Sequence, residues 1–304
     1  MNRKNFIKQS GSLLLLTSLK RFDMGQHEVF SLNTTEQKKN PVCSTCGTQF
    51  PAGQHPPELC PICDDDRQYI NEKGQSYTSL AELDKQYTVK ITQVNEHLYA
   101  LKMLPDFAIG QRCFLVISPA GNILWDCIPL LNEAVVAFIR SKGGLKAIAF
   151  SHPHYYSTMS DWAAAFNCPI LIHESDKQWI MDKSEAVEFW SGHNKPMWEG
   201  IRIINIGGHF PGSSLLFLPA QSSKGALLCG DSLYIARSKR HIAVMHSYPN
   251  QILLTKKEFA SVYKKSAELE FDTMLGAFEG QSLAGNAKEI FEKSMKRYLD
   301  SYEL

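Results

Sequence analysis

The sequence lacks the features that mark two large classes of protein. No apolar run reaches the length of about 18 to 20 residues that a membrane-spanning helix requires, so no membrane span is expected. Neither sign of charge is in excess, because 32 lysine and arginine residues stand against 31 aspartate and glutamate residues, which leaves a net charge of +1. A polyanion-binding surface is therefore not indicated, and nucleic acid is not an expected partner. The 304 residues, with 44% hydrophobic content, suffice for one large core and a small additional segment.

Residues 1–40 are predicted to be an N-terminal tail and linker. The basic segment 2–8 precedes the short apolar run 11–19, and this pattern resembles a twin-arginine export signal with Arg3-Lys4 in place of two arginines. No small-x-small cleavage site follows the apolar run, and Lys20-Arg21 comes directly after it. The protein is therefore expected to be cytoplasmic, with export through this signal as the alternative. A frayed amphipathic tail and a start at Met24 are the other interpretations of the segment.

Four of the eight cysteines form two C-x-x-C pairs, and residues 41–68 are predicted to fold around them. The pairs are Cys43 with Cys46 and, after a gap of thirteen residues, Cys60 with Cys63. Each pair makes a tight turn whose two sulfurs point at one ion, and four thiolates complete a tetrahedral site. We expect one structural zinc ion here, whose binding energy would be folding energy for so short a segment. The alternative to a metal site is two disulfides. The alternative metal is iron, because the C-P-x-C half resembles a rubredoxin knuckle.

Residues 85–304 have the pattern of one large α/β domain. Two β-rich halves, each accompanied by helices, indicate a four-layer sandwich. Asn132 is expected to begin a helix through Arg140, and Ser157 is expected to begin a helix over 158–166. Capping boxes are expected at Thr255–Glu258 and at Asn286–Glu289. Apolar runs predict strands over 97–104, 112–118, 122–128, 145–150, 168–174, 201–206, 213–220 and 225–231.

Four candidate metal ligands follow three of these predicted strands. His152 and His154 flank Pro153 directly after the strand 145–150, and residues two apart on an extended chain share a face. His209 follows a glycine pair in GGHFPGS, and Asp231 ends the apolar run that precedes it. Taken alone, each of these residues has an ordinary interpretation as a turn or surface residue. Together, they predict a metal site where the ends of buried strands meet.

The order and spacing of these motifs resemble those of the metallo-β-lactamase superfamily over roughly residues 91–304. The resemblance implies an αββα sandwich with a metal cleft at the sheet edges. It implies that His152, His154 and His209 form the first metal position and that Asp231 is the carboxylate that usually bridges to a second. Asp126 falls where the family carries a buried aspartate that supports the metal loops.

The sequence also departs from the family pattern His-x-His-x-Asp-His. Tyr156 stands in the place of the aspartate, Ser157 in that of the second histidine, and Ala277 in that of a later histidine. Three ligands of the second metal position are therefore missing, and one cleft metal is expected, which we take to be zinc with iron as the alternative. Glu279 is the one nearby carboxylate that could substitute in part.

A zinc ion with an open position lowers the pKa of its water to about 7, so the leading interpretation is a hydrolase of a small-molecule ester, lactone or amide. Asp231 would orient the water, and Tyr156, or its neighbour Tyr155, would donate a hydrogen bond to a developing oxyanion. One alternative is a mononuclear non-haem iron dioxygenase of sulfur metabolism, in which His152, His209 and Asp231 form a facial triad. The other is a catalytically degenerate metal-binding or interaction module. The substrate and the oligomeric state do not follow from the sequence.

Overall fold

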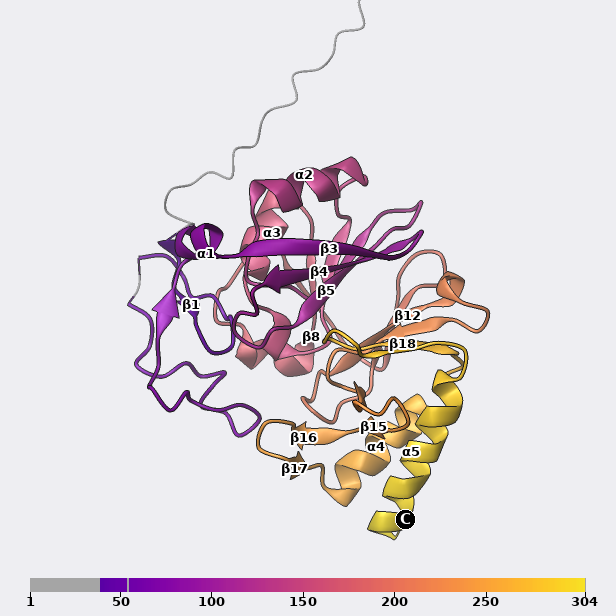
Figure 1. The fold of residues 1–304 in the computed structure, drawn as a ribbon. Helices are drawn as coiled ribbons and strands as arrows, with labels where there is room; N and C mark the ends of the chain where they lie inside the picture. Colours follow the sequence, from indigo (N-terminus) through magenta and orange to yellow (C-terminus); the bar gives the residue numbers. More distant parts are fainter. Residues whose placement is uncertain (1–38, 54, 304) are drawn as a thin grey trace, which may run out of the picture. The chain divides into compact units, whose positions relative to one another are not determined.

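A seven-stranded mixed sheet is built by the first half of the large domain (Figure 1). This description rests on a computed structural model, which describes residues 39–53 and 55–303; the predicted export segment lies outside these residues. Strands β6 to β9 pair in parallel, so their carboxyl ends share one edge of the sheet. In spatial order the strands are β3 (Thr88–Asn95), β4 (Leu98–Leu104), β5 (Arg112–Val116), β6 (Ile123–Trp125), β7 (Ala147–Ala149), β8 (Ile170–His173) and β9 (Val187–Trp190).

A six-stranded sheet is built by the second half of the chain. Its strands pair in antiparallel fashion except at β13 and β18, which run in parallel. Two small hairpins follow β13, formed by β14 (Tyr234–Ile235) with β15 (Ile242–Ala243), and by β16 (Met245–Ser247) with β17 (Ile252–Leu253). The strands of the sheet are β10 (Asn194–Pro196), β11 (Arg202–Asn205), β12 (Ser214–Leu218), β13 (Ala226–Leu228), β18 (Thr273–Leu275) and β19 (Ser282–Leu283).

Helices cover the outer face of each sheet. Helices α2 (Glu133–Ser141) and α3 (Met159–Phe166) pack on the seven-stranded sheet, and α4 (Lys256–Ser266) and α5 (Ala287–Tyr302) pack on the other. Strand alternation explains the layers: Leu115 packs toward α2, whereas Phe114 and Val116 face the core between the sheets. The predicted four-layer α/β sandwich is confirmed, and all eight predicted strands are present. Among the described residues, no helix is long and apolar enough to cross a membrane.

The predicted helix starts have mixed outcomes. The side chain of Asn132 accepts a hydrogen bond from the backbone N–H of Val135, and Thr255 forms the predicted capping box with Glu258. The prediction for Asn286 is wrong, because its side chain makes no capping hydrogen bond. The prediction for Ser157 is also wrong. Thr158 precedes α3 instead, and the Ser157 hydroxyl donates to the main-chain oxygen of Gly47.

The four-cysteine segment lies in the same compact unit as the sandwich. Its regular structure is a two-residue pairing of β1 (Val42–Cys43) with β2 (Tyr77–Thr78), and the short helix α1 (Leu80–Gln86) follows. Its own core consists of the four cysteines, Phe50 and Ile62. So small a core indicates that the segment depends on contacts with the sandwich or on a bound ion.

The different starts of α2 and α5 predict different costs of substitution. Asn132→Ala removes a capping acceptor and should lower the free energy of unfolding by about 1 kcal/mol. The matched change Asn286→Ala removes no capping bond and should lower it by much less. Urea unfolding followed by circular dichroism measures both. Equal losses would contradict this account of the helix starts.

Candidate metal centre

Four buried side chains converge where the two sheets meet. His152 and His154 follow β7, His209 follows β11, and Asp231 follows β13. One candidate ligand atom from each side chain lies within 4.8 Å of the others. Relative exposure is 1% for His152, 3% for His154, 1% for His209 and 6% for Asp231. The structure therefore brings together all four cleft residues that the sequence predicted.

The two histidines of His152-Pro153-His154 meet by a different route from the one expected. The chain is extended at His152, but Pro153 begins a short 3-10 helix through Tyr155, so the alternation of an extended strand ends there. The two imidazole centroids nevertheless lie 5.1 Å apart. Proline suits the first position of a helical turn, because its φ is preset and no N–H is needed there.

A chain of hydrogen bonds orients His152. The buried carboxylate of Asp126 accepts from the backbone N–H of Ser151 at 2.7 Å and from its hydroxyl at 2.9 Å. The Ser151 hydroxyl proton is thereby committed to Asp126, so the hydroxyl oxygen accepts from Nδ1 of His152 at 2.9 Å. The lone pair of His152 then lies on Nε2. Asp126 thus supports the first metal loop, as the family resemblance implied.

His209 is oriented by a main-chain carbonyl. Its Nδ1 lies 2.7 Å from the oxygen of His246, and because a carbonyl only accepts, Nδ1 carries the proton. Its Nε2 lies 3.3 Å from Nδ1 of His154. Two nitrogens bound at about 2.0–2.1 Å to one tetrahedral ion are about 3.3–3.4 Å apart. The spacing therefore fits two ligands of a shared ion.

Tyrosine hydroxyls hold Asp231 in place. Tyr155 donates to its Oδ2 at 2.7 Å, and Tyr248 donates to its main-chain oxygen at 2.6 Å. Oδ2 also lies 3.9 Å from Nε2 of His152. One carboxylate oxygen is thus fixed by Tyr155, and the other, Oδ1, is uncommitted.

Unpaired polar atoms at this site supply a test of metal binding. His152 Nε2, His154 Nε2 and Asp231 Oδ1 are buried and have no hydrogen-bond partner among the described residues. Burial lowers the pKa of His209 to about 3 and lowers the pKa values of the other two histidines well below the usual value. Neutral imidazole is the form that binds metals, and a cation would compensate the unpaired atoms of His152 and Asp231, whereas His154 would bind it through Nδ1, the atom that lies 3.3 Å from Nε2 of His209. The donor set of three histidines and a carboxylate therefore fits a metal ion.

The residues that depart from the family pattern lie outside this cluster. Tyr156 packs against Phe150 in the core under α2 and α3, with ring centroids 5.0 Å apart, so the structure places this predicted catalytic residue outside the cluster. The 3-10 turn after Pro153 directs Tyr155, not Tyr156, toward Asp231. The suggested substitute Glu279 is half exposed and pairs with Lys90 and Lys102, away from the histidines.

The four cysteines of the N-terminal segment form a second buried cluster. Sγ of Cys43 lies 3.6 Å from that of Cys63, and Sγ of Cys46 lies 3.7 Å from that of Cys60. Both separations are too long for disulfides, and both are close to the spacing of about 3.8 Å expected for thiolates held at about 2.3 Å in a tetrahedron. The structure thus contains the predicted four-cysteine group in a geometry that fits one ion.

Arg67 is a residue at the candidate site that the sequence did not reveal. Its Nε donates to the main-chain oxygen of His209 at 2.6 Å, and its guanidinium lies 4.6 Å from the centroid of Phe210. Asp66, beside it, contacts Nε2 of His246 at 2.8 Å. These partners are more than 140 residues apart in sequence, so no local signal in the run of three aspartates and an arginine could have indicated the contact.

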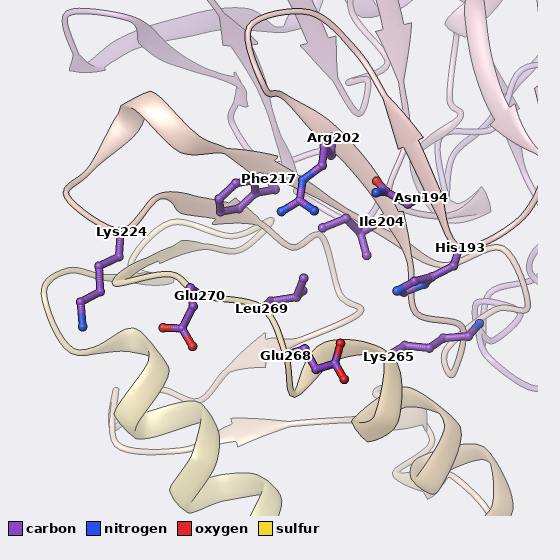
Figure 2. A pocket seen from close by; sticks show the side chains of 10 residues that line it. All are labelled: His193, Asn194, Arg202, Ile204, Phe217, Lys224, Lys265, Glu268, Leu269 and Glu270. Atoms are coloured by element: carbon purple, nitrogen blue, oxygen red, sulfur yellow. The ribbon is translucent and has the colours of Figure 1, made fainter.

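A separate hollow lies beside the outer face of the second sheet (Figure 2). It has a volume of about 450 Å³ and is lined by residues of β10, β11 and β12 and by the end of α4 with the loop that follows. The guanidinium of Arg202 in this hollow lies 4.8 Å from the centroid of Phe217. None of the four cleft residues lines it, so it is distinct from the candidate metal centre.

Comparison with known proteins places the chain in a family. The sequence matches no family model. It is 39% identical over 261 residues to the uncharacterized protein YmaE of Bacillus subtilis (strain 168), a match that covers 85% of this chain and 95% of YmaE. The chain belongs to the family of YmaE.

Solved structures assign the fold of this YmaE-family protein. A metallo-β-lactamase from Erythrobacter litoralis matches with a TM-score of 0.52 and 16% identity, covering 69% of this chain and 96% of that one. The metallo-β-lactamase FIM-1 from Pseudomonas aeruginosa matches with a TM-score of 0.51 and 13% identity, covering 70% and 96%. The YmaE-family chain therefore has the metallo-β-lactamase fold, as its sequence motifs predicted, with a four-cysteine group added near its N-terminus.

The contrast between adjacent tyrosines gives a matched pair of variants. Tyr155→Phe removes the donor to Oδ2 of buried Asp231 and should lower the free energy of unfolding by about 1–3 kcal/mol. Tyr156→Phe keeps the packing against Phe150 and should have a much smaller effect. Chemical unfolding compares the two. A larger loss in Tyr156→Phe would show that the wrong tyrosine has been assigned to Asp231.

Proposed function

We propose that the protein is a metal-dependent hydrolase that uses one cleft ion to act on a small-molecule substrate. The observation that carries the proposal is the convergence of three buried imidazoles and a buried carboxylate, in which His152 Nε2 and Asp231 Oδ1 lack partners among the described residues. Leaving such atoms unpaired costs about 1–3 kcal/mol each, and a bound cation offsets that cost. The metallo-β-lactamase fold supports this assignment.

His152, His154 and His209 would hold the ion, with Asp231 beside them. Three imidazoles and a carboxylate suit zinc, which we propose as the cleft metal, and zinc likewise for the four-cysteine group. One cleft ion is proposed because the positions of three second-site ligands are taken by Tyr156, Ser157 and Ala277, none of which belongs to the cluster.

A zinc ion held there would lower the pKa of a water molecule to about 7 and polarise a carbonyl group. Asp231 can orient that water, because Tyr155 anchors its Oδ2 while its Oδ1 remains free to accept a hydrogen bond. Tyr155 is thus a positioning residue. Phe210 packs beside His152 and His154 and keeps this side of the site apolar.

The burial of the ligands favours one alternative function. With no ligand more than 6% exposed, the centre suits a small co-substrate such as dioxygen. His152, His209 and Asp231 would then form the facial triad of a mononuclear iron dioxygenase. The two functions use the same side chains and differ in the metal.

Metal content per chain tests the ligand assignment. The wild-type protein should carry two ions, one in each cluster. His209→Ala removes a cleft ligand and should reduce the content to one ion, because the cysteine group is unaffected. Elemental analysis that quantifies zinc and iron separately supplies the measurement. Two ions retained in His209→Ala would contradict the cleft assignment, and three in the wild type would contradict a single cleft ion.

Turnover tests the reaction class. Zinc-loaded protein should hydrolyse at least one compound in a panel of esters, lactones and phosphodiesters, and His209→Ala should reduce that rate to background. Glu279→Gln serves as the control and should keep the wild-type rate, since Glu279 pairs with lysines at the surface. Oxygen uptake by iron-loaded protein with a persulfide would instead select the dioxygenase. Metal-loaded protein with neither activity would contradict both enzyme proposals and leave the metal-binding module.

A further inference from the structure

Each cysteine pair is followed in sequence by a contact with one of the two loops that carry the cleft histidines. Gly47 comes directly after Cys46, and Asp66 and Arg67 come shortly after Cys63. Gly47 contacts the loop that carries His152 and His154. Arg67 contacts the loop of His209, and Asp66 contacts His246, which is hydrogen-bonded to His209. The residues after the first cysteine pair therefore contact the loop of His152 and His154, and the residues after the second pair contact the loop of His209.

The first contact is a pair of hydrogen bonds around Ser157, three residues after His154. The Ser157 hydroxyl donates to the oxygen of Gly47 at 3.0 Å, and the backbone N–H of Gln49 donates to the oxygen of Ser157 at 3.2 Å. Gly47 has φ +81°, and a Cβ there would lie 2.8 Å from Cγ of Pro129, so only glycine fits this close approach. Ser157 itself has φ +48°, a conformation that needs support from its neighbours.

The second contact holds His209 from two sides. Arg67 donates to the main-chain oxygen of His209, and two carboxylate oxygens of Asp65 fix the same guanidinium at 2.8 and 3.0 Å. On the other side, Asp66 contacts the imidazole of His246, whose main-chain oxygen accepts from Nδ1 of His209. The backbone and the ring of His209 are thus both tied to residues 65–67.

Order in residues 47 and 65–67 is expected to depend on closure of the cysteine cluster as well as on contacts with the sandwich. The segment has one two-residue strand pairing and a core built mainly from the cysteines themselves. In so small a unit, the free energy of binding an ion to four thiolates is the free energy of folding. Groups that orient metal ligands from outside the coordination sphere typically change metal affinity by about 10- to 100-fold.

We propose that the ion-loaded four-cysteine segment is a clamp that positions the two histidine loops, with Gly47 and Arg67 as its contact residues. The clamp rests on the proposed cleft ion. It raises the affinity of the cleft for its metal without supplying a ligand. Loss of the cysteine-bound ion by chelation releases both loops and weakens the cleft site.

Cobalt substitution tests the clamp, because the two clusters then have different spectra. Cobalt bound to four thiolates gives intense charge-transfer absorption, whereas cobalt bound to imidazoles and a carboxylate gives weaker visible bands alone. A chelator titration of the full chain therefore reports the affinity of each site separately. Arg67→Met keeps most of the packing over Phe210 and removes the bond to His209.

Arg67→Met should weaken cobalt binding in the cleft by about 10- to 100-fold and leave the thiolate bands unchanged. Arg202→Met is the matched control, because Arg202 also stacks on a phenylalanine, at 4.8 Å, but its side chain makes no hydrogen bond to either histidine loop among the described residues. It should leave both affinities at the wild-type value. Wild-type cleft affinity in Arg67→Met would overturn the clamp.

Ser157→Ala tests the other arm of the clamp in case Arg67→Met does not fold. It removes the hydroxyl that donates to Gly47 and should weaken the cleft site about 10-fold. Ser160→Ala is the control: it removes a hydroxyl that donates to the main-chain oxygen of Asp182, and it should leave the affinity of the cleft site unchanged. Unchanged cleft affinity in Ser157→Ala would overturn this arm. If the wild-type protein shows thiolate bands alone, there is no cleft ion, and the proposed function is overturned. Unchanged cleft affinity in the variants is a different result, because it overturns the clamp and leaves the proposed function standing.

Discussion

The burial of three imidazoles and one carboxylate at the meeting point of two sheets is the constraint on which the rest of the structure depends. Polar atoms without partners in such a place cost about 1–3 kcal/mol each, and several are found at this one point. The surrounding hydrogen bonds fix the outer nitrogens of two rings: Asp126 acts through Ser151 on Nδ1 of His152, and the main-chain oxygen of His246 accepts from Nδ1 of His209. We propose a cation as the partner that completes this arrangement.

The metallo-β-lactamase fold supplies the positions, and the four-cysteine segment supplies support that the sandwich alone does not contain. In the sandwich, the loop that follows β7 of one sheet meets the loops that follow β11 and β13 of the other sheet. Those loops are irregular, and Ser157 has a left-handed backbone. Contacts from Gly47 and Arg67 hold them from outside. The small segment is therefore part of the site's structure and not an appendage to it.

The local sequence pattern predicted the strands and the candidate ligands. It did not predict which of two neighbouring side chains lies in the core and which lies at the candidate site. Apolar runs that end in His152, His209 or Asp231 are visible in the sequence because strand ends and ligands are adjacent in the chain. Tyr156 lies in the core because a 3-10 turn after Pro153 rotates the chain, so Tyr155 and not Tyr156 reaches Asp231. Arg67 was missed because its contact spans 142 residues, and no periodicity records a contact of that kind.

Anomalous X-ray diffraction at the zinc and iron edges, from crystals of the metal-loaded protein, tests the central claim most directly, because it locates and identifies each ion at once. The account predicts two anomalous peaks per chain. One should lie among the sulfurs of Cys43, Cys46, Cys60 and Cys63, and the other among His152, His154, His209 and Asp231. A cleft with no peak, or with two, would contradict it.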